Sequence, residues 1–126
     1  MITGIYAGLC GLLLITLYIR VSQRRLATKI GVGCGSDEIL EQRIRAHGNF
    51  IESVPIALIL LFLVEQTGAD PLYIHAFGII LVLARLGHAQ GMSTTLGRSA
   101  GRFYGAIGTL LVILALSLWL VVSAVA

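Results

Sequence analysis

Polar side chains in the segment from Arg45 to Glu52 lead directly into an apolar stretch, Ser53 to Val64. At 3.6 residues per turn, Arg45, Asn49 and Glu52 stand at positions i, i+4 and i+7, which places them on one face of a helix. A charge at the centre of a membrane helix costs roughly 2.5–3.5 kcal/mol on insertion scales, so charged residues there indicate a functional site. A cation, an amide and an acid on one face have the chemistry to bind a small polar ligand.

A second group of polar residues lies farther along the chain. Arg85 and His88 stand one turn apart near the end of another apolar stretch, and Arg98 and Arg102 follow in and after the next polar connection. If the two stretches are neighbouring helices, Arg85 and His88 lie close in height to Asn49. We therefore expect the two groups to meet in one polar site.

Each of these residues also has a purely structural interpretation. Arg45 and Glu52 can form a polar network between packed helices, and His47 can pack or cap without binding anything. Arg85 and His88 can form a hydrogen-bonded pair between helices. The ligand-binding interpretation is favoured for Arg45 and Glu52, whereas the two interpretations of His47 are nearly balanced.

The elements that must position these residues are membrane helices. The chain has 126 residues, of which 57% are hydrophobic and only 12% charged, and its mean hydropathy is +0.94. This is far more apolar than a soluble domain of this length. Four apolar stretches can each reach about 20 residues, enough to cross a hydrocarbon core roughly 30 Å thick. We predict an all-α integral membrane four-helix bundle, a single domain with helices over about residues 2–28, 37–66, 71–92 and 101–125.

The first apolar stretch, Met1 to Ile19, has two interpretations. It carries no charge and could be a cleaved signal peptide, but it lacks the basic start of one. Arg20, Arg24 and Arg25 follow it as a stop-transfer flank would. We favour a spanning helix.

Glycines recur at four-residue spacing in three of the predicted helices, a pattern that lets membrane helices approach closely. We expect the face of the first helix that carries glycine to pack on another helix. The glycines concerned are Gly4, Gly8 and Gly11, Gly87 and Gly91, and Gly101 and Gly105.

The distribution of basic residues predicts the orientation in the membrane. All nine fall in two zones, Arg20 to Arg45 and Arg85 to Arg102, whereas the connection around Asp70 holds acids and no bases. By the positive-inside rule, both termini lie outside, and the first and third connections face the cytoplasm together with the polar site. Arginines beside anionic lipid account for the net charge of +3. No nucleic-acid-binding signature appears, so we expect no such partner.

Two other sequence features carry no chemistry in this interpretation. Cys10 lies in an apolar helix and Cys34 in a cytoplasmic loop, so we expect neither a disulfide nor a metal site. The glycine-rich segment from Gly31 to Gly35 lacks the preceding strand and the residue frame of a phosphate-binding loop, and it reads as a flexible connection.

The polar segment of the second helix resembles the signature of the MAPEG superfamily, membrane-associated proteins of eicosanoid and glutathione metabolism. The similar run is Arg45-Ala46-His47-Gly48-Asn49-Phe50-Ile51-Glu52, with Pro55 just after it. The resemblance extends to the run from Ala84 to Gly91 and to the basic residue that opens the fourth helix, so it covers nearly the whole chain. The chain is most similar to the small bacterial branch, whose members resemble microsomal glutathione transferases, and this implies a bacterial inner membrane location.

The resemblance implies a homotrimer that binds glutathione, as co-substrate, between neighbouring subunits near the cytoplasmic side. Carried over residue by residue, the second-helix signature would hold the tripeptide. Arg24 matches more loosely a basic residue that meets a glutathione carboxylate, with Arg25 as the alternative. The binding set is then Arg24, Arg45, His47, Asn49, Glu52 and Arg85.

The same resemblance implies a catalytic set of Arg102, Arg98 and His88. His88 stands where the superfamily has a tyrosine or histidine facing the ligand. Either Arg98 or Arg102 would activate the thiol, and we favour Arg102 because it opens a helix. Lowering a thiol pKa from about 8.5 by two units requires roughly 2.7 kcal/mol of preferential stabilisation of the thiolate, which one close arginine can supply. The thiolate would attack a lipophilic electrophile or reduce a lipid hydroperoxide.

Three positions depart from the pattern of the superfamily. Gly48 replaces a basic side chain that some members have, and Ser53 replaces an aromatic next to the glutamate of the leukotriene-forming synthase. Met92 stands where several eicosanoid-forming members have a tyrosine. These differences weigh against eicosanoid substrates more than against glutathione.

Two other functions stay open at this point. A small proton-coupled multidrug transporter also has four short helices and one intramembrane glutamate. However, a carboxylate meant for a cationic drug should not share its helix face with Arg45 and be joined by Arg85. The third possibility is a non-catalytic membrane protein that binds lipid or glutathione, which binding without turnover would identify.

Overall fold

The computed structural model describes residues 1–95 and 97–125 and consists of four α-helices joined by short connections. They are α1 (Thr3–Thr28), α2 (Glu38–Gln66), α3 (Pro71–Thr94) and α4 (Ala100–Val125). Their ends lie within two residues of the expected bounds, and the described ranges contain no strand. All four helices are long and apolar enough to cross a membrane. The predicted fold class, an all-α integral membrane four-helix bundle, is confirmed.

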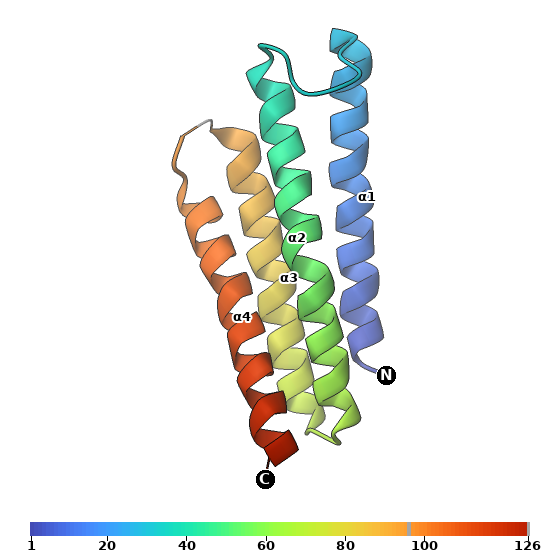
Figure 1. The fold of residues 1–126 in the computed structure, drawn as a ribbon, viewed down its shortest axis with the longest axis vertical. Helices are drawn as coiled ribbons and strands as arrows, with labels where there is room; N and C mark the ends of the chain where they lie inside the picture. Colours follow the sequence, from blue (N-terminus) through green and yellow to red (C-terminus); the bar gives the residue numbers. More distant parts are fainter. Residues whose placement is uncertain (96, 126) are drawn as a thin grey trace.

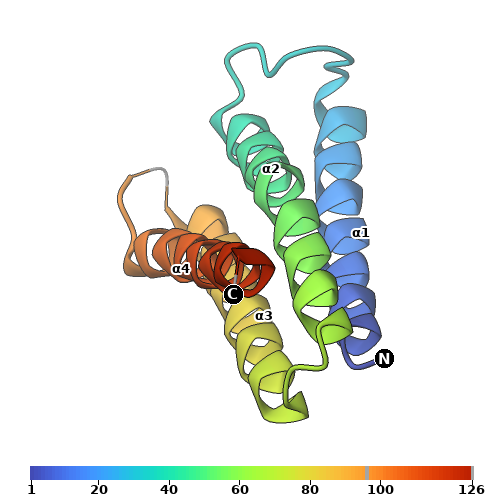
Figure 2. The ribbon, with the colours of Figure 1, turned by 60° about the horizontal axis from the view of Figure 1, so that its bottom comes forward.

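The helices form two hairpins, α1 with α2 and α3 with α4. Figure 1 shows both termini at one end of the bundle together with the α2–α3 connection, and the other two connections at the opposite end. In Figure 2, α1 and α2 run side by side while α4 crosses α3. The most extensive helix contacts lie within the hairpins, and α2 joins them by packing on both α3 and α4.

Carboxylates cap the starts of two helices. The Asp37 side chain accepts a hydrogen bond from the backbone N–H of Leu40 at 2.6 Å, and the Asp70 side chain accepts one from Leu72 at 2.8 Å. Both bonds satisfy N–H groups that the first turn of a helix leaves without partners. Pro71 follows Asp70 at a position where its missing N–H costs nothing.

The start of α1 is capped from another helix. Glu65, near the end of α2, accepts hydrogen bonds from the backbone N–H groups of Ile2 and Thr3, the second at 2.9 Å. This acid therefore ties the first turn of α1 to the end of α2. At the same end of the bundle, the Tyr6 hydroxyl and His75 Nδ1 lie 2.7 Å apart and join α1 to α3.

The glycines of α3 and α4 bring these two helices into backbone contact. A Cβ on Gly101 would lie 2.6 Å from the carbonyl oxygen of Gly87, and one on Gly105 would lie 2.5 Å from the carbonyl oxygen of Ala84. Close packing through these spacings is therefore confirmed. For α1, no helix of the same chain packs on this face: nothing lies within 4 Å of a Cβ built on Gly8 or Gly11, so the expected packing on another helix stays a prediction. That face of α1 has no neighbour because α2 and α3 pack on its other sides.

A Gly105→Ala substitution is expected to destabilise the second hairpin by about 1–3 kcal/mol, because its methyl group would overlap the Ala84 carbonyl and His88 where α3 and α4 are in backbone contact. The measurement is the midpoint of thermal unfolding of detergent-purified protein. The matched control is Gly8→Ala, whose methyl group meets open space and should leave the midpoint unchanged or slightly higher. Equal midpoints for the two variants would contradict the close crossing.

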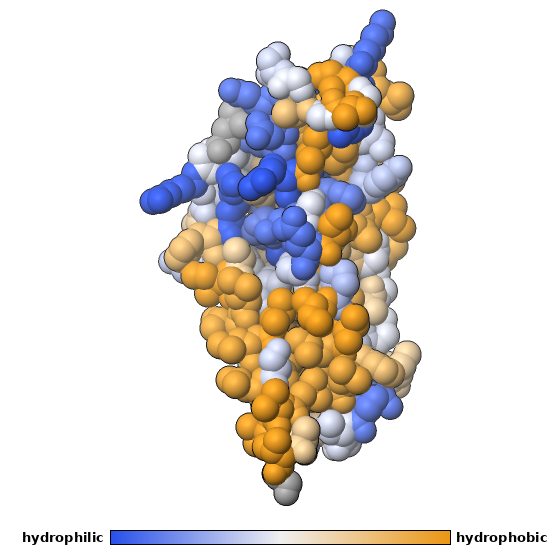
Figure 3. All heavy atoms as spheres, viewed as in Figure 1, coloured by the Kyte–Doolittle hydropathy of each residue, from blue (hydrophilic) through white to orange (hydrophobic). Residues whose placement is uncertain are grey.

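Hydrophilic residues gather toward one end of the bundle. In Figure 3 they occupy the half nearer the 29–37 and 95–99 connections, and hydrophobic residues cover most of the half nearer the termini. Most of the polar residues identified from the sequence belong to the ends of α2, α3 and α4 that lie in this half.

Candidate functional site

Five polar side chains from three helices line one cleft of about 260 Å³. We call it the polar cleft; its polar lining is Arg45, Asn49 and Glu52 from α2, His88 from α3 and Arg102 from α4. The helical spacing of the α2 residues therefore does bring them to one face, and the expected meeting of the two polar groups occurs here. Arg45 and Glu52 are exposed at the rim, and His88 is buried at the base.

Arg85 lies beneath the cleft and does not line it. Its side chain is only 1% exposed, and Nη2 donates a 2.9 Å hydrogen bond to Asn49 Oδ1 and contacts His88 Nδ1 at 3.3 Å. Nη1 approaches Thr109 Oγ1 at 3.4 Å, and the guanidinium carbon lies 5.5 Å from the centre of the Phe50 ring. Arg85 thus joins three helices through neutral partners.

The contacts of Arg85 fix the orientation of two side chains in the cleft. A guanidinium can only donate hydrogen bonds, so Asn49 must present its oxygen to Arg85 and its NH₂ group elsewhere. By the same reasoning His88 accepts at Nδ1, and its neutral form carries its proton on Nε2. Both residues line the cleft, so each has an N–H group with which to bind a ligand there.

No carboxylate oxygen lies within 4.0 Å of the Arg85 guanidinium in the described part of the chain, where the ion pairs involve Glu65 and Asp37. A buried cation without an ionic partner makes its surroundings attractive to anions. Because this cation lies directly below Asn49 and His88, the base of the polar cleft favours a negatively charged group.

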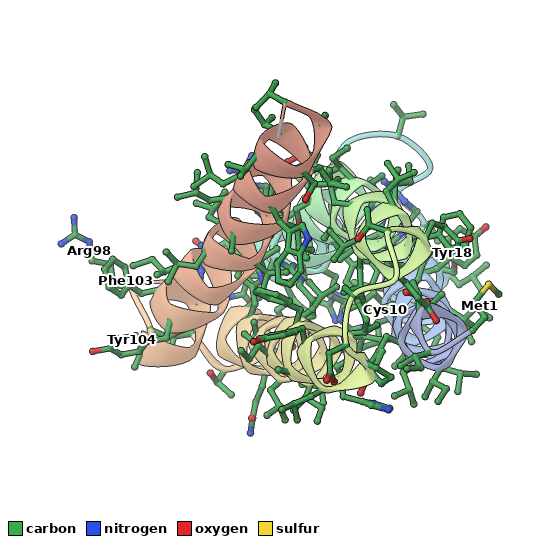
Figure 4. The ribbon with its side chains drawn as sticks, turned by 90° about the horizontal axis from the view of Figure 1, so that it is seen from below. Met1, Cys10, Tyr18, Arg98, Phe103 and Tyr104 are labelled. Carbon is green, nitrogen blue, oxygen red and sulfur yellow. The ribbon has the colours of Figure 1, made fainter. Side chains whose placement is uncertain are left out.

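Arg98 and Arg102 occupy different environments. Ser99 caps α4 by accepting a 3.2 Å hydrogen bond from the Arg102 backbone N–H, and Arg102 Nη1 donates a 2.7 Å bond to the Gly97 carbonyl. Its side chain lines the polar cleft. Arg98 is exposed and points away from the bundle in Figure 4. The structure therefore brings Arg102, and not Arg98, to the cleft.

A wider hollow adjoins the cleft at the start of α4. It has a volume of about 970 Å³ and shares His88 and Arg102 with the polar cleft. The rest of its lining is residues 97–100, Arg98 among them, with Phe103 and Tyr104. These two aromatic residues are exposed and point outward in Figure 4. A lipophilic molecule lying against them would be next to Arg102.

Arg24 lies away from the polar cleft. Its guanidinium forms a bidentate ion pair with Asp37: Nε donates to Oδ1 at 3.0 Å and Nη2 donates to Oδ2 at 2.6 Å. The pair and the Leu40 N–H hold the pKa of the Asp37 carboxyl below its usual value, so it is ionised at neutral pH. Arg25 instead binds the carbonyl oxygens of Ile30 and Gly33. Within one chain, both arginines organise the 29–37 connection.

His47 also faces away from the polar cleft. Its ring lies 6.1 Å from that of Tyr18 on α1. His47 follows Arg45 by two residues, which places it on nearly the opposite face of the helix. The side chains of Arg45 and His47 therefore lie on different sides of α2. The prediction that His47 and Arg24 bind the same ligand as Arg45 therefore requires a second copy of the chain.

Sequence reasoning did not assign several residues to the site. Thr109 contacts the Arg85 guanidinium and Phe50 lies beside it. Met92, noted from the sequence only as a departure from the superfamily, lines the cleft. A smaller hollow of about 190 Å³ beside Arg45 and Arg102 is also lined by Glu38 and Glu41. Thr109 could have been noticed as a polar residue inside the apolar α4, and Glu41 as the residue four before Arg45.

Comparison with known proteins shows which family the chain belongs to. A family model described as the MAPEG family matches residues 3–122. Two curated relatives are named inner membrane protein YecN, one from Escherichia coli strain K12 and one from Escherichia coli O6:H1. Each is 36% identical over 98 residues, which cover 78% of this chain and 75% of the relative.

Proposed function

Because the chain belongs to the MAPEG family, we propose that it binds glutathione in the polar cleft and uses the thiolate against a lipophilic electrophile or a lipid hydroperoxide. Family membership supports a membrane function related to glutathione. The observation that carries the finer proposal is the convergence of Arg45, Glu52 and Arg102, with two oriented N–H donors, in one cleft.

The functional groups of the cleft match those of glutathione, which has two carboxylates, one ammonium and one thiol. Arg45 at the rim would bind a carboxylate, and Glu52 would bind the ammonium. Asn49 would donate through the NH₂ group that Arg85 turns away from itself. The smaller hollow beside Arg45 adds Glu38 and Glu41 as further acids for the ammonium.

Arg102 would act on the thiol. Its positive charge, at the first turn of α4, adds to the partial positive charge of the helix N-terminus and favours the thiolate. His88 would donate its Nε2–H to the same sulfur and cannot accept the proton in this tautomer, so the proton leaves to water. The buried charge of Arg85 lowers the energy of the anion further.

The substrate would arrive from the bilayer. The hollow lined in part by Phe103 and Tyr104 also reaches Arg102, which supports entry of a lipophilic molecule. The thiolate would form a C–S bond to an electrophilic carbon as that carbon expels its leaving group. With a hydroperoxide it would form an S–O bond as the O–O bond breaks, the alkoxide would leave as the alcohol after taking a proton from water, and a second glutathione would convert the sulfenic acid to glutathione disulfide and water. The cations in the cleft disfavour the alternative of a transporter for cationic drugs, since they would repel its cargo.

The proposal extends to a homotrimer in the inner membrane, with the site facing the cytoplasm and both termini outside. The inner membrane is the location named for the Escherichia coli relatives, and the positions of Arg24 and His47 support assembly. These residues lie on a side of α1 and α2 other than the polar cleft, where they would complete the cleft of a neighbouring copy.

The experiment that tests the proposal is calorimetric binding of glutathione to detergent-purified protein. Saturable binding is expected, weakened at least tenfold in Arg45→Ala, which loses a charged hydrogen bond worth about 1.5–3 kcal/mol. Lys29→Ala removes an exposed cation outside the cleft and should bind normally. Absence of binding by the parent protein would refute the proposal, and binding with no turnover of any electrophile would identify a non-catalytic binder.

A further inference from the structure

Two arginines line a separate pocket between α1, α2 and α3. It has a volume of about 140 Å³, and its polar lining is Arg20, Gln42, Arg43 and Ser93; we call it the arginine pocket. Arg20 Nη1 donates a 2.6 Å hydrogen bond to Ser93 Oγ, and Arg43 Nη1 donates a 2.7 Å bond to the Arg20 carbonyl. Both guanidinium groups are thus fixed by neutral partners.

The charge of the arginine pocket is unbalanced. Arg43 lies within reach of the charges of Arg20 and Arg24, and the carboxylate that acts on it is Asp37. That carboxylate is already held at two points by Arg24. Among the described residues, Arg20 and Arg43 form no ion pair within 4.0 Å, so the pocket has the electrostatics of an anion site.

An apolar groove lies along the seam between α1 and α3, two of the helices that also line the arginine pocket, and it shares no lining residue with that pocket. The α1–α3 groove has a volume of about 360 Å³ and is lined by Leu9, Leu13 and Thr16 from α1 and by Val82 and Leu86 from α3, among others. On α1 these positions lead by steps of four and three residues to Arg20, and on α3 they lead to Ser93. One helical stripe on each side therefore connects the groove to the pocket.

A charged pocket and an apolar groove on the same two helices match the two parts of a lipid molecule, its headgroup and its acyl chain. A phosphate would sit between Arg20 and Arg43, at the level where the charge-free part of α1 ends, and an acyl chain would lie below it in the groove. We propose that the chain binds an anionic phospholipid along the α1–α3 seam, with its phosphate in the arginine pocket. An anionic headgroup is favoured over a zwitterionic one because the carboxylate that acts on Arg43, that of Asp37, is already held by Arg24.

The site is separate from the polar cleft. The polar cleft lies between α2, α3 and α4. Met92 lines both hollows, but Arg20 and Arg43 do not line the polar cleft. Lipid binding therefore does not depend on the proposed glutathione chemistry, and either can fail alone.

The test is native mass spectrometry of the intact protein in detergent, titrated with dioleoyl phosphatidylglycerol, dioleoyl phosphatidylcholine or inorganic phosphate. Phosphatidylglycerol is expected to bind tightest, and Arg20→Gln and Arg43→Gln should each weaken it about fivefold. Lys29→Gln makes the same charge change at an exposed position of the same end and should have no effect.

Three results would overturn the proposal. They are equal binding of the anionic and zwitterionic lipids, binding of inorganic phosphate as tight as that of the lipid, and unchanged lipid binding in the two arginine variants. If a glutamine variant fails to fold, Arg43→Lys replaces it in the test. Lysine keeps the charge but lacks the planar guanidinium, so the loss of lipid affinity should be smaller than the fivefold loss expected for Arg43→Gln. Affinity equal to that of the parent in Arg43→Lys and in Arg20→Lys would also count against the pocket.

Discussion

An Arg102→Ala variant is expected to bind glutathione but to hold it as the neutral thiol at pH 7. In the parent protein a thiol pKa lowered by about two units leaves most of the bound thiol ionised, whereas at about 8.5 only a few per cent is thiolate. The ultraviolet absorbance of the bound thiolate measures this directly. The rate with a lipophilic electrophile should fall at least tenfold along with the absorbance.

The matched control for this variant is Arg98→Ala, which makes the same charge change four residues earlier in a side chain that points away from the bundle (Figure 4). It should keep the thiolate signal. Because Arg102 also binds the Gly97 carbonyl, Arg102→Gln is a useful second variant: it retains an N–H donor for the connection but not the charge. A thiolate signal lost in Arg98→Ala and kept in Arg102→Ala would assign thiol activation to Arg98.

The second large effect is expected for Arg85→Met, which should bind glutathione about 30-fold more weakly, with a modest fall in the unfolding midpoint. Removing the buried charge abolishes its desolvation cost, and this offsets part of the cost of leaving Asn49 and His88 without their partner. Binding suffers because Asn49 and His88 lose the donor that orients them, at about 1 kcal/mol for each misdirected hydrogen bond. Unfolding midpoint and binding calorimetry on the same samples separate the two effects.

Thr109→Val serves as the control for Arg85→Met. It removes another partner of the same guanidinium from α4, but Thr109 does not line the polar cleft. We expect a lower unfolding midpoint and nearly normal glutathione affinity. If Arg85→Met bound glutathione normally, Arg85 would have a structural role only. This is the interpretation that the sequence left open, in which Arg85 and His88 form a hydrogen-bonded pair.

The helices and the shared face of Arg45, Asn49 and Glu52 could be predicted because both depend on local periodicity. Length and hydropathy determine a spanning helix, and a spacing of four and then three residues determines a face. The same rule puts His47 on another side of α2. The difference between Arg98 and Arg102 was also partly local, since it depends on where α4 starts.

The partners of Arg85 could not be predicted, because they depend on how three helices pack. Asn49 and Thr109 lie 36 and 24 residues away in the chain, and no spacing relates such distances. The glycine pattern shows the same limit. Identical four-residue spacings pack tightly in α3 and α4 and meet open space in α1, because the pattern permits a close neighbour without specifying one.

The division into two hairpins has a consequence for how the protein is made. A charged arginine is expensive to move from the translocation machinery into lipid on its own. Arg85 has two of its partners, His88 and Thr109, within its own α3–α4 hairpin, and the glycine crossing holds those helices together. The hairpin can thus enter the bilayer as a unit that already shields the cation. Asn49 belongs to the other hairpin, so the polar cleft is complete only where the two hairpins dock.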